Sequence, residues 1–219
     1  MRVIRLNNDK VTFQIEYPDE LEGLYERFYK FFSPYFRSER DSVAEPDFSL
    51  SLIPSEQFSG EWKDLCYREE TIRKSSAREF NLTVSIGQLV NGQTVAWCER
   101  DQTGYLYSSG GRRIDVYVNS NSFFHLIELV RYYLLLLEQN SGTLIFHAAA
   151  VKCRDTGEII AICGNKGAGK TSTMLQLVKD GHHTYFSGDK LLVDMQDSSL
   201  RVRGWPDFPH IGYGTLRSH

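Results

Sequence analysis

A phosphate-binding motif stands in the C-terminal part of the 219-residue chain. Residues 164–171 read Gly-Asn-Lys-Gly-Ala-Gly-Lys-Thr and match the pattern G-x-x-x-x-G-K-S/T at every fixed position. The apolar residues 159–163 are typical of a strand, and residues 170–179 have the amphipathic pattern of a helix. Because the motif lies between a strand and a helix, we interpret it as a phosphate-binding loop (P-loop) and not as a chance glycine-rich turn.

The residue types of this loop suit the phosphates of a nucleotide. Glycines let the backbone turn so that successive N–H groups point inward, and the helix start adds partial positive charge. We expect Lys170 to bind the β- and γ-phosphates of ATP and the Thr171 hydroxyl to coordinate Mg²⁺. Lys166 is either solvated or faces the phosphates. The nucleotide-binding residues that we expect are Gly164, Asn165, Lys166, Gly167, Ala168, Gly169, Lys170, Thr171 and Ser172.

Phosphoryl transfer also needs a carboxylate or a similar base to orient the acceptor hydroxyl. Asp189 follows an expected strand at residues 184–187, and ligands gather at such strand ends in open α/β sheets. It is our candidate for the base or a metal ligand, and the alternative is a turn-forming aspartate. Asp194 is a second candidate metal ligand, with a solvated strand end as its alternative.

The remaining polar candidates are less specific. His147 is flanked by apolar and small residues, so a core histidine and an active-site role fit the sequence equally well. Arg203 and Arg217 are weak candidates for phosphate contacts. The other histidines lack metal-ligand spacing, and the cysteines stand singly, so we expect reduced thiols with neither a structural zinc nor a disulfide. The cysteines are Cys66, Cys98, Cys153 and Cys163.

Composition limits the class of protein. Hydrophobic residues make up 41% of the chain and charged residues 24%, which is typical of a globular protein. The formal net charge of -3 gives no global positive field that would attract nucleic acid or an anionic membrane. The N-terminus turns polar too early for a signal peptide, and charges interrupt the most apolar segment, residues 123–137. We therefore expect a cytoplasmic protein without nucleic-acid or membrane partners.

The N-terminal part of the chain is expected to be rich in strands. Residues 11–17 alternate like a strand, residues 19–32 have helical spacing, and the polar residues 33–46 predict a surface connection. Between residues 47 and 118, short runs with high β-propensity alternate with turn pairs such as Asn91-Gly92, which predicts an antiparallel sheet.

The C-terminal part must position the motif. Capping residues at 119–122 predict a helix over residues 123–138, which ends before Gly142. Strands are expected at residues 143–151 and 158–163. We therefore expect two lobes, a β-rich lobe over residues 1–118 and a nucleotide-binding core over residues 119–219.

The order of motifs resembles that of HPr kinase/phosphorylase and its looser relatives, over residues 142–217. The segments that carry the resemblance are Phe146-His147-Ala148-Ala149-Ala150-Val151, the phosphate-binding motif, Gly181-His182, and Ser187-Gly188-Asp189-Lys190-Leu191-Leu192-Val193. The resemblance implies a mixed α/β (α+β) chain, in which a β-rich N-terminal portion precedes a P-loop core of the type shared with phosphoenolpyruvate carboxykinase.

The resemblance also implies residue roles. In that family a histidine precedes the strand before the loop, and an aspartate after the next strand acts as base while carboxylates help hold magnesium. His147 and Asp189 occupy the matching places, which implies catalytic roles for Asp189, His147 and Lys170 and a magnesium site at Thr171 and Asp189. Gly188, however, stands where many members have an aspartate, and the signature for HPr recognition is not visible.

Two functions follow as alternatives. The first is a phosphotransferase that moves the γ-phosphate of Mg-ATP to a hydroxyl of a peptide, a protein or a small molecule. The second, suggested by Gly188, is a nucleotide sensor or structural module without turnover. Because little sequence follows the motif, we expect strands before residue 163 to complete its sheet. The sequence leaves open whether the chain is truncated at His219 or borrows elements from a neighbouring subunit, so a homo-oligomer is one option.

Overall fold

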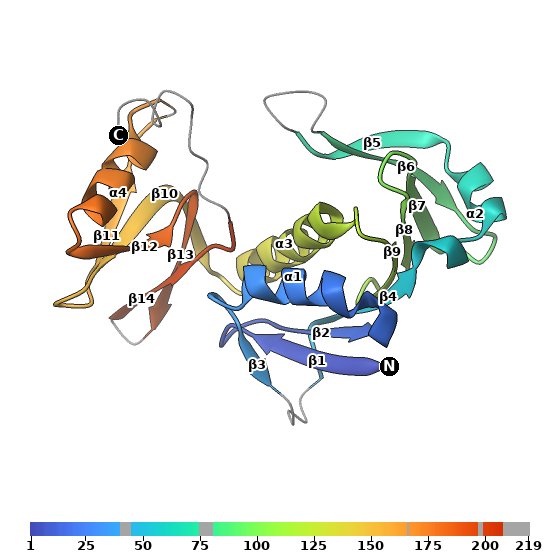
Figure 1. Cartoon of the computed structure of the whole chain (residues 1–219), viewed down its shortest axis with the longest axis horizontal. Helices are drawn as coiled ribbons and strands as arrows, with labels where there is room; N and C mark the ends of the chain where they lie inside the picture. Colours follow the sequence, from blue (N-terminus) through green and yellow to red (C-terminus); the bar gives the residue numbers. More distant parts are fainter. Residues whose placement is uncertain (40–44, 75–80, 166, 197–198, 208–219) are drawn as a thin grey trace. The chain divides into compact units, whose positions relative to one another are not determined.

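The structure is a computed structural model that describes residues 1–39, 45–74, 81–165, 167–196 and 199–207 (Figure 1). The chain divides into two compact units, Met1–Leu136 and Leu137–His219. This division lies inside helix α3 (Phe123–Asn140), whereas the expected lobes meet before that helix begins. Over the described residues, no helix combines the length and the apolar character needed to cross a lipid bilayer.

The first unit is built on a mixed nine-stranded sheet, as counted over the described residues. The strand order is β3-β1-β2-β4-β9-β8-β7-β6-β5. The strands are β1 (Arg2–Asn7), β2 (Thr12–Tyr17), β3 (Arg37–Glu39), β4 (Phe48–Pro54), β5 (Arg68–Arg73), β6 (Leu82–Gln88), β7 (Thr94–Cys98), β8 (Thr103–Tyr107) and β9 (Arg113–Val118). The helical elements before α3 are η1 (Asp19–Leu21), α1 (Glu22–Phe32), η2 (Ser55–Gln57) and α2 (Gly60–Leu65).

The expected antiparallel sheet is only partly confirmed. Strands β5 to β9 pair antiparallel, as predicted, but β4 pairs parallel with both β2 and β9. A parallel pair needs a crossover connection, and α1 lies in the crossover between β2 and β4. The expected surface connection at residues 33–46 was also partly wrong, because β3 pairs with β1 there.

Aromatic side chains form much of the core beside α1. The helix buries Leu24, Tyr25, Phe28, Phe31 and Phe32 at the spacing that the sequence predicted. The Phe13 ring of β2 stacks on Phe48 of β4 with a centroid separation of 5.2 Å and meets Phe28 edge-on. The expected strand and helix at the start of the chain are therefore confirmed, together with a β-rich N-terminal portion.

The second unit is organised around β10 (Leu144–Cys153). Its other elements are β11 (Ile159–Cys163), α4 (Lys170–Lys179), β12 (His183–Ser187), β13 (Lys190–Gln196) and β14 (Ser199–Gly204). Residues of β10 pair with β11 and with β12 over the same stretch, so these two strands flank β10 on opposite edges. The first half of β10 pairs with β13, which forms a hairpin with β14. The mixed α and β class is confirmed.

The two faces of β10 pack against different elements. Helix α4 lies against one face of the sheet (Figure 1), and Ala149 and Val151 of β10 pack with the buried Met174 of that helix. Ala148 and Ala150 point to the other face and pack with Leu191 of β13. This alternation of small residues fits a strand that is covered on both faces.

Candidate functional site

The motif residues connect the end of β11 to the start of α4, as expected. Gly167 and Gly169 have φ angles of 86° and 85°, a region that residues with a side chain rarely adopt. A Cβ atom on Gly164 would lie 3.0 Å from the Cβ of Ala168. Each of these glycines therefore has a steric reason to be in the loop.

Hydrogen bonds within the loop fix its curvature. The Ala168 N–H donates to the Asn165 carbonyl at 3.1 Å, and the Thr173 N–H donates to the Gly169 carbonyl at 2.9 Å as α4 begins. The Lys170 ammonium group donates to the carbonyls of Gly164, at 2.8 Å, and Asn165, at 3.4 Å. Lys170 thus folds over the loop, and these contacts are ones that phosphate oxygens can replace.

The other expected nucleotide ligands surround the same helix start. Thr171 and Ser172 are half-buried in the first turn of α4, at the helix end where backbone N–H groups point outward and the helix dipole places partial positive charge. Asn165, Gly167 and Ala168 are exposed. Lys166 lies outside the described residues. The helix start therefore supplies donors and a hydroxyl to one side of the loop.

The sheet register places Asp189 at the same end of the sheet as the loop. Ala148 of β10 pairs with Cys163, the last residue of β11, and the Ala148 N–H donates to the Asp189 carbonyl at 3.1 Å. Adjacent strands lie roughly 4.8 Å apart, so Asp189 is about 10 Å from the start of the loop. One ligand of the length of a triphosphate can reach both.

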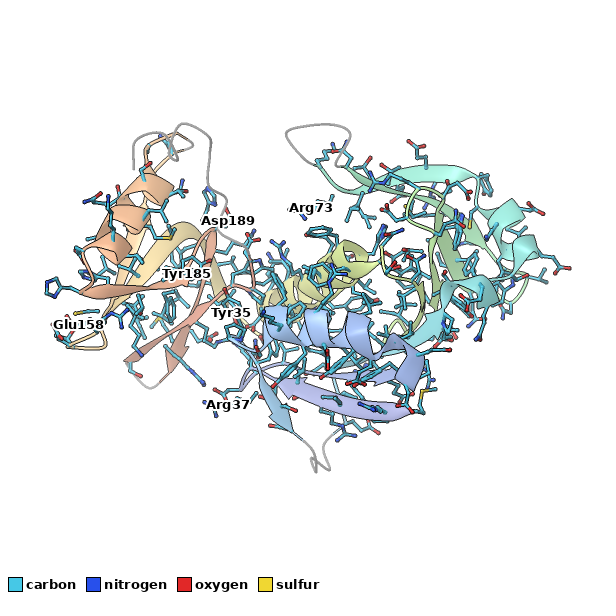
Figure 2. All side chains as sticks on the ribbon, in the orientation of Figure 1. Tyr35, Arg37, Arg73, Glu158, Tyr185 and Asp189 are labelled. Carbon is cyan, nitrogen blue, oxygen red and sulfur yellow. The ribbon has the colours of Figure 1, made fainter. Side chains whose placement is uncertain are left out.

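Asp189, which Figure 2 labels, stands in the turn between β12 and β13, and two nitrogen-bearing side chains contact its carboxylate. The Lys190 ammonium lies 2.7 Å from Oδ2, and His147 Nδ1 lies 3.1 Å from Oδ1. The His147 side chain is 62% exposed, so the alternative of a buried core histidine is wrong. Asp189 is 30% exposed, which leaves its carboxylate accessible from solvent. The structure thus brings His147 and Asp189 together.

Asp194 and Arg203, the weaker candidates, belong to a buried ion-pair network. Arg203 contacts Glu138 Oε1 and Oε2 at 2.5 and 2.6 Å and Asp194 Oδ2 at 2.7 Å. The Thr143 hydroxyl lies 2.8 Å from Glu138 Oε2 and 2.7 Å from Asp194 Oδ1. Burial lowers the pKa of Arg203, but its bonds to the two carboxylates outweigh this and raise it. The side chains of this network hold α3, β13 and β14 together, so Asp194 and Arg203 are not available to a ligand. Arg217, the other weak candidate, lies outside the described residues.

Sequence reasoning missed Lys190 as a partner of Asp189. Two neighbouring charged residues in a turn usually indicate no more than solvation, so the signal was weak. The pairing of β10 with β13 shows that Lys190 belongs to this group, because Lys190 of β13 lies opposite His147 of β10. His147, Asp189 and Lys190 therefore form one polar group beside the loop.

No protein-family model matches the chain, and no curated protein matches its sequence. The relation to HPr-kinase-related proteins therefore stays a prediction from the residues.

Proposed function

We propose that the chain is a phosphotransferase that moves the γ-phosphate of Mg-ATP to a hydroxyl of a peptide, a protein or a small molecule. The observation that carries this proposal is the loop at residues 164–171, with glycines at positive φ and Lys170 folded over it. Asp189, about two strand spacings away at the same end of the sheet, supports it. We further propose that this unit is a P-loop core of the HPr-kinase type.

The proposed roles follow from the chemistry of each side chain. Lys170 exchanges its two loop carbonyls for β- and γ-phosphate oxygens, and loop N–H groups bind the remaining oxygens. The oxygen donors of Thr171 and Asp189 suit Mg²⁺, which would neutralise charge on the phosphates. Asp189 accepts the proton of the acceptor hydroxyl, and His147 holds the carboxylate in place through its 3.1 Å contact. Lys190 supplies a positive charge beside it.

A transfer assay tests this proposal. The protein is incubated with γ-labelled ATP, magnesium and candidate acceptors, and label on the acceptor is measured. We expect Asp189→Asn to reduce transfer by about 10²- to 10⁴-fold, because it removes the base. The control is Asp155→Asn, which changes an exposed carboxylate in the turn between β10 and β11. Undiminished transfer by Asp189→Asn would refute the assigned role.

A second function, nucleotide sensing without turnover, is favoured by one specific observation. Both carboxylate oxygens of Asp189 are engaged, by Lys190 and His147, and Gly188 offers no second carboxylate. An aspartate whose two carboxylate oxygens are both bound by neighbouring side chains can hold the site closed without acting as a base. Calorimetry separates the two functions, since a sensor binds Mg-ATP tightly and forms neither ADP nor a phosphorylated product.

A further inference from the structure

The first unit contains a cluster of metal-ligand side chains that is separate from the proposed nucleotide site. Cys98 ends β7, Asp101 lies in the turn before β8, and His125 lies in the first turn of α3. One ligand atom from each of the three lies within 4.8 Å of the other two. Cys98 and His125 are buried, and the Asp101 side chain is 19% exposed. The cluster is therefore compact but reachable at its carboxylate.

The separations among these atoms suit tetrahedral zinc. Zinc bonds of about 2.0 to 2.3 Å with tetrahedral angles place the donor atoms about 3.3 to 3.8 Å apart. Cys98 Sγ lies 3.7 Å from Asp101 Oδ2, within this range. His125 Nε2 lies 2.8 Å from the same oxygen, which is a hydrogen-bond distance. A small rotation of the Asp101 carboxylate would widen this separation to that of two zinc ligands.

Neighbouring side chains already orient two of the three donors. The Tyr105 hydroxyl lies 2.6 Å from His125 Nδ1, which leaves Nε2 as the atom that faces Asp101 and Cys98. Arg100 holds both carboxylate oxygens of Asp101, with Nε donating to Oδ1 at 3.0 Å and Nη2 donating to Oδ2 at 2.7 Å. The bond to Oδ1 can persist while Oδ2 exchanges its bond from Nη2 for a metal. Such contacts from the second layer of side chains are typical of histidine and carboxylate metal ligands.

The cluster is reached from solvent through its carboxylate, because the Asp101 side chain is 19% exposed whereas Cys98 and His125 are buried. Three protein donors fill three tetrahedral positions, and the fourth is left for a water molecule on the Asp101 side.

We propose that Cys98, Asp101 and His125 bind one zinc ion, with a water molecule as the fourth ligand. A soft thiolate with an imidazole favours zinc over magnesium or calcium, which prefer oxygen ligands. The Cys98 thiol loses its proton on binding. His125 stays neutral, but its ring proton, which Nε2 donates to Asp101 when no metal is bound, moves to Nδ1 and is donated there to the Tyr105 oxygen. One proton is therefore released for each zinc bound.

The spacing of residues in the sequence could not reveal this site. From that spacing we expected no structural zinc. Cys98 and Asp101 are close in the chain, but His125 arrives from α3 after two further strands. The helix N-terminal turn must pack against the β7–β8 turn before the donors meet. The buried hydrogen bond between Thr103 and Ser122, 2.7 Å long, joins these two segments.

Metal titration of the full chain provides the test. We expect one equivalent of Zn²⁺ to bind, with release of one proton as measured by calorimetry in two buffers of different ionisation enthalpy. Cobalt substitution should give a thiolate-to-cobalt charge-transfer band in the near ultraviolet. Absorption spectroscopy at the zinc edge should detect one sulfur among nitrogen and oxygen ligands, and it requires no variant.

Variants identify the ligands. We expect Cys98→Ala to abolish the charge-transfer band and Tyr105→Phe to weaken zinc binding by about 10- to 100-fold, since the latter removes only the partner of His125. The matched control is Cys163→Ala, which removes an exposed thiol in the other unit and should change neither. Zinc binding without a sulfur ligand, binding unaffected by Cys98→Ala, or no stoichiometric binding would each overturn the proposal.

Discussion

Replacing Arg203 by methionine should destabilise the second unit strongly. The variant leaves the carboxylates of Glu138 and Asp194 without their guanidinium partner, and their side chains are 0% and 8% exposed. Removing one partner of a buried ion pair costs about 3–5 kcal/mol, because the remaining charge cannot reach water. An exposed ion pair would cost only about 0–1 kcal/mol. The large value applies here because Arg203 itself is only 12% exposed and contacts both carboxylates.

Urea denaturation followed by tryptophan fluorescence measures this change. Trp205 is buried in the second unit, so a background with Trp62→Phe and Trp97→Phe makes it the reporter of that unit. The control is Arg154→Ala, an exposed arginine in a turn, which should change the unfolding free energy by less than about 0.5 kcal/mol.

A second substitution should rescue part of the stability that Arg203→Met loses. Adding Glu138→Gln to Arg203→Met removes one of the two unpaired charges and should recover part of the lost stability. If Arg203→Met costs less than about 1 kcal/mol, or if Glu138→Gln makes the double variant less stable still, buried-charge pairing does not hold these elements together.

Two further predictions concern Lys170 and Cys153. Lys170→Ala should weaken Mg-ATP binding by about 1.5–3 kcal/mol, because a charge-assisted contact is lost; Lys179→Ala, at the other end of α4, serves as control in calorimetry. Hydrogen bonds from Thr156 lower the pKa of Cys153, whereas burial raises the pKa of Cys66. At neutral pH Cys153 should therefore hold more thiolate and be alkylated faster by iodoacetamide, and Thr156→Val should slow it. Equal alkylation rates at the two cysteines would contradict this.

Local patterns predicted the elements that carry the loop. The predicted helix over residues 170–179 has the bounds of α4, because a glycine with positive φ precedes it and its apolar residues recur at helical spacing. The two strands before the loop, β10 and β11, were predicted to within a residue or two. Both signals are contained in a short window of sequence.

Contacts between distant segments were not predictable in this way. The parallel pairing of β4 depends on where the crossover through α1 returns the chain, which no short pattern specifies. Glu138, Asp194 and Arg203 lie on three separate elements, so their ion-pair network exists only once these have packed. The same holds for Lys190 and His147, which the register of β10 and β13 brings together.

The bonds from Lys170 to its own loop bear on the cost of capturing a ligand. Since the ammonium group and the left-handed glycines already hold the described residues of the loop (164, 165 and 167–169) in a curved shape, little conformational entropy remains to be lost there when an anion arrives. The loop is preorganised, and Lys170 has only to exchange one set of oxygens for another. An anion should therefore bind to this preorganised loop rapidly and with only a small loss of conformational entropy.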